Sequence, residues 1–211
     1  MRLPLAFVLL VSADPTGTSP GADRSTPITA SHSDESLAKA LTSMGDTAGV
    51  KILFDSEFRD KKLTIRFTGE SFDDALAQVL RPNRLFVKAL GEKTLVVVPD
   101  SLAKRFAYDR WEPTKPLSFV RNRAPITLSF TDASLRSVFA ALGEAAGVKF
   151  VFDQDFRDRR VSIRFEGEAF ESALDQLVLP YRLYFKAIEG DAVVIAPDSQ
   201  AVRERYEKAG R

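Results

Sequence analysis

The chain has 211 residues, of which 45% are hydrophobic and 28% are charged, so it can bury a core and is not disordered along its whole length. It contains no cysteine and one histidine, which excludes a disulfide framework and disfavours most hydrolases and metalloenzymes. We therefore expect no catalytic residues, no metal site and no cofactor.

The net charge of +1 is distributed unevenly along the chain. Residues 27–101 carry ten basic and eleven acidic side chains, and residues 125–199 carry eight and twelve. The positive surplus lies in residues 102–124, with six basic against two acidic side chains, and in residues 200–211, with four against two. Because a nucleic-acid binder concentrates basic residues on a folded face, this distribution argues against nucleic acid as the main partner.

Residues 1–13 resemble a short signal peptide, with Arg2 before an apolar run and the small residues Ser12 and Ala13 at its end. The alternative is an apolar terminus that is not cleaved. The run is too short to span a bilayer. Residues 14–26 have the composition of a flexible linker. We expect export to the periplasm.

The rest of the chain is a tandem duplication of one unit. A shift of 98 positions aligns residues 27–101 with residues 125–199 without a gap, with 35 identities in 75 positions. A period this long exceeds that of stacked solenoid repeats, so we expect two separate small domains over these ranges. Residues 102–124 then form a basic, proline-containing connector, and residues 200–211 a C-terminal tail with helical character.

The first half of each copy predicts a strand, a helix and a short strand. Residues 126–130 alternate between apolar and polar side chains, as a half-buried strand does. Thr131-Asp132 is expected to cap a helix that ends near Gly147. Residues 150–152 then form a short apolar strand.

The second half of each copy predicts a strand, a helix and two strands. An alternating strand over residues 161–165 precedes a helix that Pro82 and Pro180 end in the two copies. Two last strands are joined by glycine-containing turns at 91–92 and 189–191. The order strand, helix, strand, strand, helix, strand, strand indicates an α+β fold with two tandem small domains.

Several motifs of the second copy are similar to the secretin and TonB N-terminus short domain, the STN family. The residues that carry the resemblance are Ile126-Thr127-Leu128-Ser129-Phe130, Gly147-Val148-x-Phe150-Val151-x-Asp153, Val161-Ser162-Ile163, Ala173-Leu174 and Val194-Ile195-Ala196-Pro197. These are core and turn residues rather than a catalytic signature, so they indicate fold more than role.

The resemblance implies a periplasmic module that binds other proteins. In that family the domain sits at the periplasmic end of outer-membrane secretins, where it builds a ring, or in front of TonB-dependent receptors, where it contacts a sigma regulator. It implies envelope proteins of a secretion, pilus or receptor system as partners, and leaves a homo-oligomer open. The chain has too few strands for the pore or barrel of those relatives.

Five residues are candidates for an interaction site. Lys61-Lys62 and Arg159-Arg160 are basic pairs that enter a strand, and with Arg66 and Arg164 they could form an anion-binding ridge, although a solvated turn explains the same residues. Trp111 is the only tryptophan and lies in the connector, where we expect it to dock the two domains or to anchor a partner.

Two carboxylates and the histidine have structural explanations. Asp55 and its counterpart Asp153 are expected to cap loops by accepting backbone N–H bonds. His32 stands at the position of Phe130, so we expect it to replace an apolar side chain on a strand.

Three function classes follow from these observations. The first is a non-enzymatic periplasmic scaffold or adaptor that binds partners through edge strands. The second is a polyanion- or nucleic-acid-binding protein that uses the basic connector. The third is a hydrolase that uses Asp55 and Asp60. We favour the first.

Overall fold

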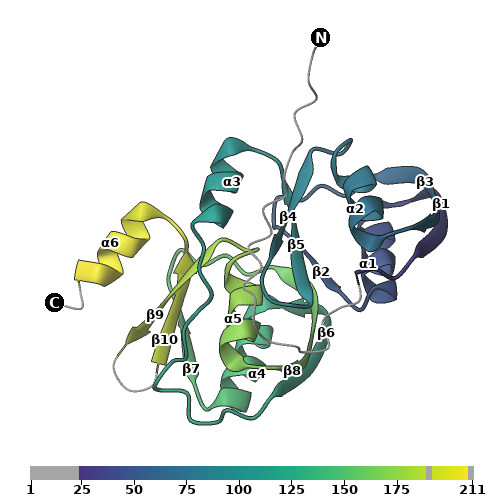
Figure 1. The fold of residues 1–211 in the computed structure, drawn as a ribbon. Helices are drawn as coiled ribbons and strands as arrows, with labels where there is room; N and C mark the ends of the chain where they lie inside the picture. Colours follow the sequence, from purple (N-terminus) through teal and green to yellow (C-terminus); the bar gives the residue numbers. More distant parts are fainter. Residues whose placement is uncertain (1–23, 189–191, 209–211) are drawn as a thin grey trace.

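The computed structural model describes residues 24–188 and 192–208, which form two units of the same design (Figure 1). The predicted signal peptide, most of the predicted linker and the turn at 189–191 lie outside the described residues. The first unit contains β1 (Ile28–Ser36), α1 (Leu37–Thr47), β2 (Lys51–Phe54), β3 (Lys62–Glu70), α2 (Phe72–Leu80), β4 (Leu85–Ala89), β5 (Thr94–Pro99) and α3 (Leu102–Asp109). The second contains β6 (Ile126–Ser134), α4 (Leu135–Ala146), β7 (Lys149–Phe152), β8 (Arg160–Glu168), α5 (Phe170–Val178), β9 (Leu183–Ile188), β10 (Ala192–Pro197) and α6 (Gln200–Lys208).

Each unit contains two small sheets. In the first unit β1 and β3 form an antiparallel pair, while β5 lies between β2, to which it is parallel, and β4, to which it is antiparallel. The second unit repeats this arrangement with β6–β8 and β7–β10–β9. Each unit has its own buried core, in which two helices pack against the sheets. The predicted α+β fold and element order are therefore confirmed.

The start of α4 differs from the prediction. Strand β6 continues through Asp132 to Ser134, and the Ser134 hydroxyl, not Thr131-Asp132, caps the helix by accepting from Ser137 N. The physical reason is a bulge: Asp132 has a φ of 49°, and its N–H bonds to the Ser162 hydroxyl instead of continuing the regular ladder. Asp34 repeats this conformation in the first unit, with a φ of 53°.

The ends of the helices agree with the sequence signals. Gly147 caps α4 in the left-handed region with a φ of 70°, and α2 and α5 both end two residues before a proline. Gly143 serves a different purpose inside α4. A Cβ atom there would lie 2.4 Å from the Val148 carbonyl oxygen, so only glycine lets the helix approach the start of β7 this closely.

The repeat runs further than residues 101 and 199. Helices α3 and α6 follow the last strand of their units in the same place, and identities continue at Ala103/Ala201, Arg105/Arg203 and Tyr108/Tyr206. The segment predicted as a connector is consequently divided between the units. Its first part forms α3 on the first unit, while Val120 is buried in the core of the second.

No helix in the described ranges is long and apolar enough to cross a membrane.

Candidate functional site

The outer face of the sheet β2–β5–β4 forms a seam with the second unit (Figure 1). Leu90, Val96 and Val98 form a buried cluster on this face with Tyr108 of α3. Leu179, which directly follows α5, packs against the same cluster. Helix α5 is therefore covered on one side by its own unit. Its other side is covered by the first unit, through Lys51 on Gln176, and by the segment that joins the units, through Thr114 on Asp175 and Leu117 on Glu171.

Polar contacts cross the seam beside this apolar cluster. The Lys51 ammonium bonds Glu168 at 3.0 Å and Gln176 at 2.5 Å, and lies 4.9 Å from the centre of the Phe165 ring. Burial lowers the pKa of Lys51, although Glu168 acts in the opposite direction. At the other end of the seam, the Ser56 N–H donates to the Pro180 carbonyl at 2.9 Å.

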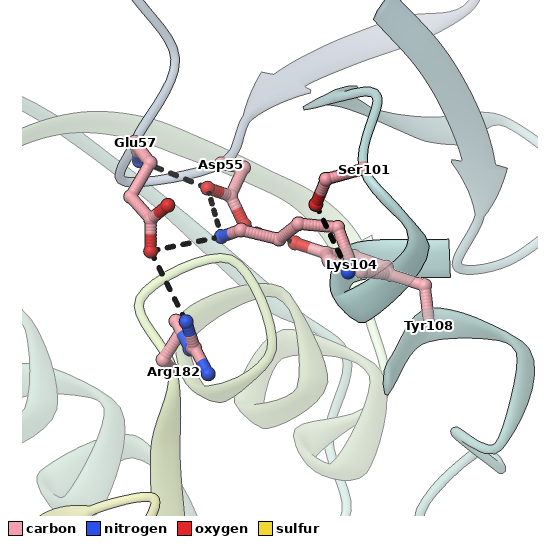
Figure 2. Close-up of polar contacts among 6 residues, drawn as sticks. All are labelled: Asp55, Glu57, Ser101, Lys104, Tyr108 and Arg182. Atoms are coloured by element: carbon pink, nitrogen blue, oxygen red, sulfur yellow. Dashed lines mark hydrogen bonds and ion pairs between the residues drawn. The ribbon is translucent and has the colours of Figure 1, made fainter. Parts of the chain in front are cut away.

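An ionic cluster lies at the edge of the seam (Figure 2). Lys104 of α3 donates to both carboxylate oxygens of Asp55, at 2.7 and 2.9 Å, and lies 3.2 Å from Glu57. The Tyr108 hydroxyl donates to Asp55 at 2.7 Å. Arg182 of the second unit reaches Glu57 at 3.1 Å, so the cluster includes both units.

The local sequence explains how these groups meet. Asp55 directly follows β2 and accepts the Glu57 N–H at 2.9 Å, which confirms its predicted loop-capping role. Ser101 caps α3 by accepting the Lys104 N–H, and Lys104 and Tyr108 are four residues apart on one face of that helix. Their side chains therefore reach the same carboxylate.

The chemistry of the cluster is that of a fixed, neutralised network. Burial, followed by the bond to Asp55, raises the pKa of Tyr108 far above its usual value, so its hydroxyl stays protonated. Hydrogen bonds from Lys104 and then from Arg182 lower the pKa of Glu57. The contacts of Lys104 are with carboxylates, and together these groups fix the end of β2 against α3 and the second unit.

The second unit holds its equivalent carboxylate differently. Asp153 accepts bonds from the Tyr206 hydroxyl and from Arg205, which also reaches Asp155 at 3.2 Å. Burial opposes ionisation of Asp153, but the bonds from Tyr206 and the Asp155 N–H, together with Arg205, outweigh it and lower its pKa. Val202 occupies the position that Lys104 has in the first unit.

The predicted arginines lie in different surroundings. Arg164 projects from β8, is paired with Glu166 at 2.6 Å, and lines a cleft of about 680 Å³ between the units. Arg66 occupies the matching position on β3 and does not line that cleft. Arg159 lines another cavity, of about 440 Å³, while Arg160 bonds the Asp132 backbone. The structure therefore does not bring these four side chains into a single ridge.

Trp111 lies at the seam between the two units. It packs against the seam cluster of Leu90, Val96, Val98 and Tyr108, which Leu179 also contacts. The sequence pointed to Trp111, but it did not reveal the ionic cluster beside it. The signal that could have found the cluster is the continuation of the repeat to Tyr108 and Tyr206, since both tyrosines bind the carboxylate after the second strand.

The two carboxylates of the hydrolase hypothesis, Asp55 and Asp60, lie in separate networks. Asp60 accepts bonds from the Ser36 hydroxyl and the Ala38 N–H at the start of α1, whereas Asp55 is neutralised by Lys104 in another network. His32 is buried and bonds Glu35, as a structural residue does, although its Nε2 atom has no partner among the described residues. Among the described residues, no group of three or more His, Asp or Glu side chains could hold a metal ion.

Residues 127–195 match the family model described as FecR, C-terminal. The match covers most of the second unit, from β6 into β10, and so about a third of the chain. No curated protein matches the chain.

The second unit is thus similar to a periplasmic domain of envelope-signalling proteins, in the broader context of TonB-dependent receptors. This finding supports the envelope context that the STN resemblance implied. It does not support the STN assignment itself.

Proposed function

We propose that the chain is a non-enzymatic periplasmic protein that binds other envelope proteins, with a receptor-signalling component as the partner of its second unit. The observation that carries the proposal is the FecR C-terminal match over residues 127–195, because proteins of that family interact with envelope receptors. A scaffold or adaptor of a secretion or pilus system is the alternative partner context within the same class of function.

The two-stranded sheet β6–β8 offers a binding edge for such a partner. No third strand joins this sheet in the part of the chain that the structure describes, so each strand has one side without a strand neighbour. On β8 the residues Val161, Ile163 and Phe165 are buried, while Arg160 is exposed and the exposed Arg164 lines the cleft between the units. A partner strand could bond to the free edge, and the exposed residues would select its sequence.

The polyanion alternative loses support because three of the six basic side chains of the connector are paired with carboxylates within the chain. Lys104 lies in the buried cluster, Arg105 pairs with Asp100 at 2.6 Å, and Arg123 lies 3.6 Å from Glu171. Neutralising phosphates supplies most of the affinity in nucleic-acid binding, so cations that are already paired contribute less to it.

Site-specific photocrosslinking tests the proposal in intact cells. A photoreactive amino acid replaces Arg164 on β8, and the matched control places it at Arg66 on β3, the same position in the other unit. We expect an adduct between position 164 and an envelope receptor or its signalling partner, identified by mass spectrometry, and little of that adduct from position 66.

Two results would count against the proposal. Adducts that contain only this chain at both positions would remove the partner. Recovery of the protein in the cytoplasmic fraction rather than the periplasmic fraction would remove the compartment in which such a partner is met.

A further inference from the structure

The second unit exposes an apolar sheet face. The equivalent face of the first unit is covered at the seam. Leu90 is 8% exposed there and Leu53 is partly buried, whereas their counterparts at the 98-residue shift, Ile188 and Val151, are 41% and 38% exposed. At the centre of the sheet face the two units are alike. Helix α6 covers part of β10 in the second unit, as α3 covers part of β5 in the first. The sheet β7–β10–β9 therefore presents an equivalent surface without the helix that covers the first.

The first unit, in turn, exposes the surface that the second unit uses for docking. Gln176 of α5 is 1% exposed and Pro180 is buried, while their counterparts Gln78 and Pro82 on and after α2 are exposed. At the seam, the first unit contributes its sheet face and leaves its helix side exposed. The second unit contributes its helix side and leaves its sheet face exposed.

The polar partners of the seam also recur at the two free surfaces. The contact of Lys51 with Glu168 and Gln176 has as its counterparts Lys149 on the open sheet and Glu70 and Gln78 on the free helix side, so all three residue types are the same. Lys149 is exposed in this chain.

The residues of a second ion pair across the seam also have counterparts of the same charge on the two exposed surfaces. The counterparts of Glu57 and Arg182 are Asp155 and Arg84, which have the same charges, and Asp155 also contacts Arg205 of its own unit at 3.2 Å. Both arginines have a φ of 54°, a conformation that non-glycine residues rarely adopt, and in both units the backbone carbonyl of that arginine accepts an N–H from the residue after β5 or β10.

We propose that copies of this chain associate head to tail, with the β7–β10–β9 face of one chain receiving helix α2 of the next. The internal seam is the template for this contact. The occupant is a second copy because its α2 side carries partners of the correct charge for Lys149 and Asp155, and no other surface needs to be assumed. Such a contact is heterologous, so it produces a ring if the rotation closes and a filament if it does not.

The association is weaker than the internal seam for two reasons. Arg81 replaces Leu179, so the free helix side lacks the apolar side chain that packs into the cluster. The chain that joins the units also raises their effective concentration to roughly the millimolar range, an advantage that separate chains lack. Tethering or crowding at an envelope complex would restore part of that advantage.

Charge exchange on the full chain tests this proposal. Sedimentation velocity over about 10 µM to 1 mM measures association of the unaltered chain, of Lys149→Glu and of Glu70→Lys. Each single variant faces like charge across the contact and should associate about tenfold more weakly or worse. An equimolar mixture of the two variants pairs opposite charges at every contact and should recover association.

A gain-of-function variant keeps the test decisive if the unaltered chain associates too weakly to measure. Arg81→Leu restores the missing apolar contact and should strengthen association about tenfold or more, the effect of burying one leucine side chain. Because all three positions lie at the surface or are only partly buried, thermal melts by circular dichroism should match the unaltered chain.

Concentration-dependent association that the single variants weaken and the mixture restores would support the proposal. Monomeric behaviour of both the unaltered chain and Arg81→Leu at the highest concentration would overturn it. Association that none of the charge variants changes would also overturn it, because the contact would then lie elsewhere. Either result leaves the partner proposed for β6–β8 unaffected, since that test uses a different surface.

Discussion

Replacement of Lys104 by valine tests how much the ionic cluster contributes to stability. The Asp55 side chain is fully buried at 0% exposure and that of Lys104 is 7% exposed, so the pair is removed from water. Among the described residues, valine leaves the Asp55 carboxylate with the Tyr108 hydroxyl and the Glu57 N–H as its polar contacts. Loss of one partner of a buried ion pair typically costs about 3–5 kcal/mol, and we expect a loss in this range for Lys104→Val.

The second unit suggests a further substitution that should restore the stability lost in Lys104→Val. There Val202 already stands at the position of Lys104, and Arg205, at the position of Ala107, binds the equivalent carboxylate. The double variant Lys104→Val, Ala107→Arg therefore transfers the second unit's arrangement to the first. It should recover at least half of the lost free energy of unfolding.

The assay is urea unfolding followed by the fluorescence of Trp111, the only tryptophan, which packs against the cluster that contains Tyr108. Circular dichroism on the same samples reports both units. A loss below about 1 kcal/mol for Lys104→Val would refute the view that this ion pair holds α3 in place. Absence of any recovery in the double variant would refute the equivalence of the two carboxylate sites.

Three further outcomes follow from the structure. Leu179→Ala should cost about 1–2 kcal/mol of docking between the units, seen as an increased radius of gyration in small-angle X-ray scattering. Gly143→Ala should destabilise the second unit by about 1–3 kcal/mol in urea unfolding, since its Cβ would meet a carbonyl oxygen at 2.4 Å, while Gly91→Ala, with open space around it, should change little. Because the folded-state pKa of Asp153 lies below its ordinary 3.8, its stabilising contribution is complete above that value and is lost as the pH falls through the lowered pKa. Tyr206→Phe removes one bond that lowers this pKa, so the acid-unfolding midpoint, measured by circular dichroism, should move to higher pH.

Hydrophobic periodicity was sufficient to predict the elements of the fold. Alternation along residues 161–165 predicts a strand that the buried core confirms, and the helix predicted to end near Gly147 is also observed. The duplication helped because the same signals, such as Pro82 and Pro180, recur in both copies. This information is local, since it depends on residues within one strand or one helix.

The parts that the sequence did not reveal depend on contacts between distant residues. A Thr-Asp pair before a helical stripe is a normal capping signal, and only the pairing of Asp132 with Ser162 across the sheet places it in a bulge. Lys104 was counted among the charges of a basic connector, because its contact with Asp55 joins residues 49 positions apart. The burial of Gln176 likewise depends on the other unit.

The position of α5 between the two units has a consequence for the way the protein opens. Its outer residues Glu171, Asp175 and Gln176 are buried, whereas Asp73 and Gln78, the counterparts of Glu171 and Gln176 on α2, are exposed. Backbone amides of α5 can exchange with solvent only after both the seam and the second core have separated, so they should be among the slowest in the molecule, and those of α2 should exchange sooner. Unfolding of the second unit would also uncover the seam cluster of the first, so we expect the stabilities of the two duplicated modules to be coupled.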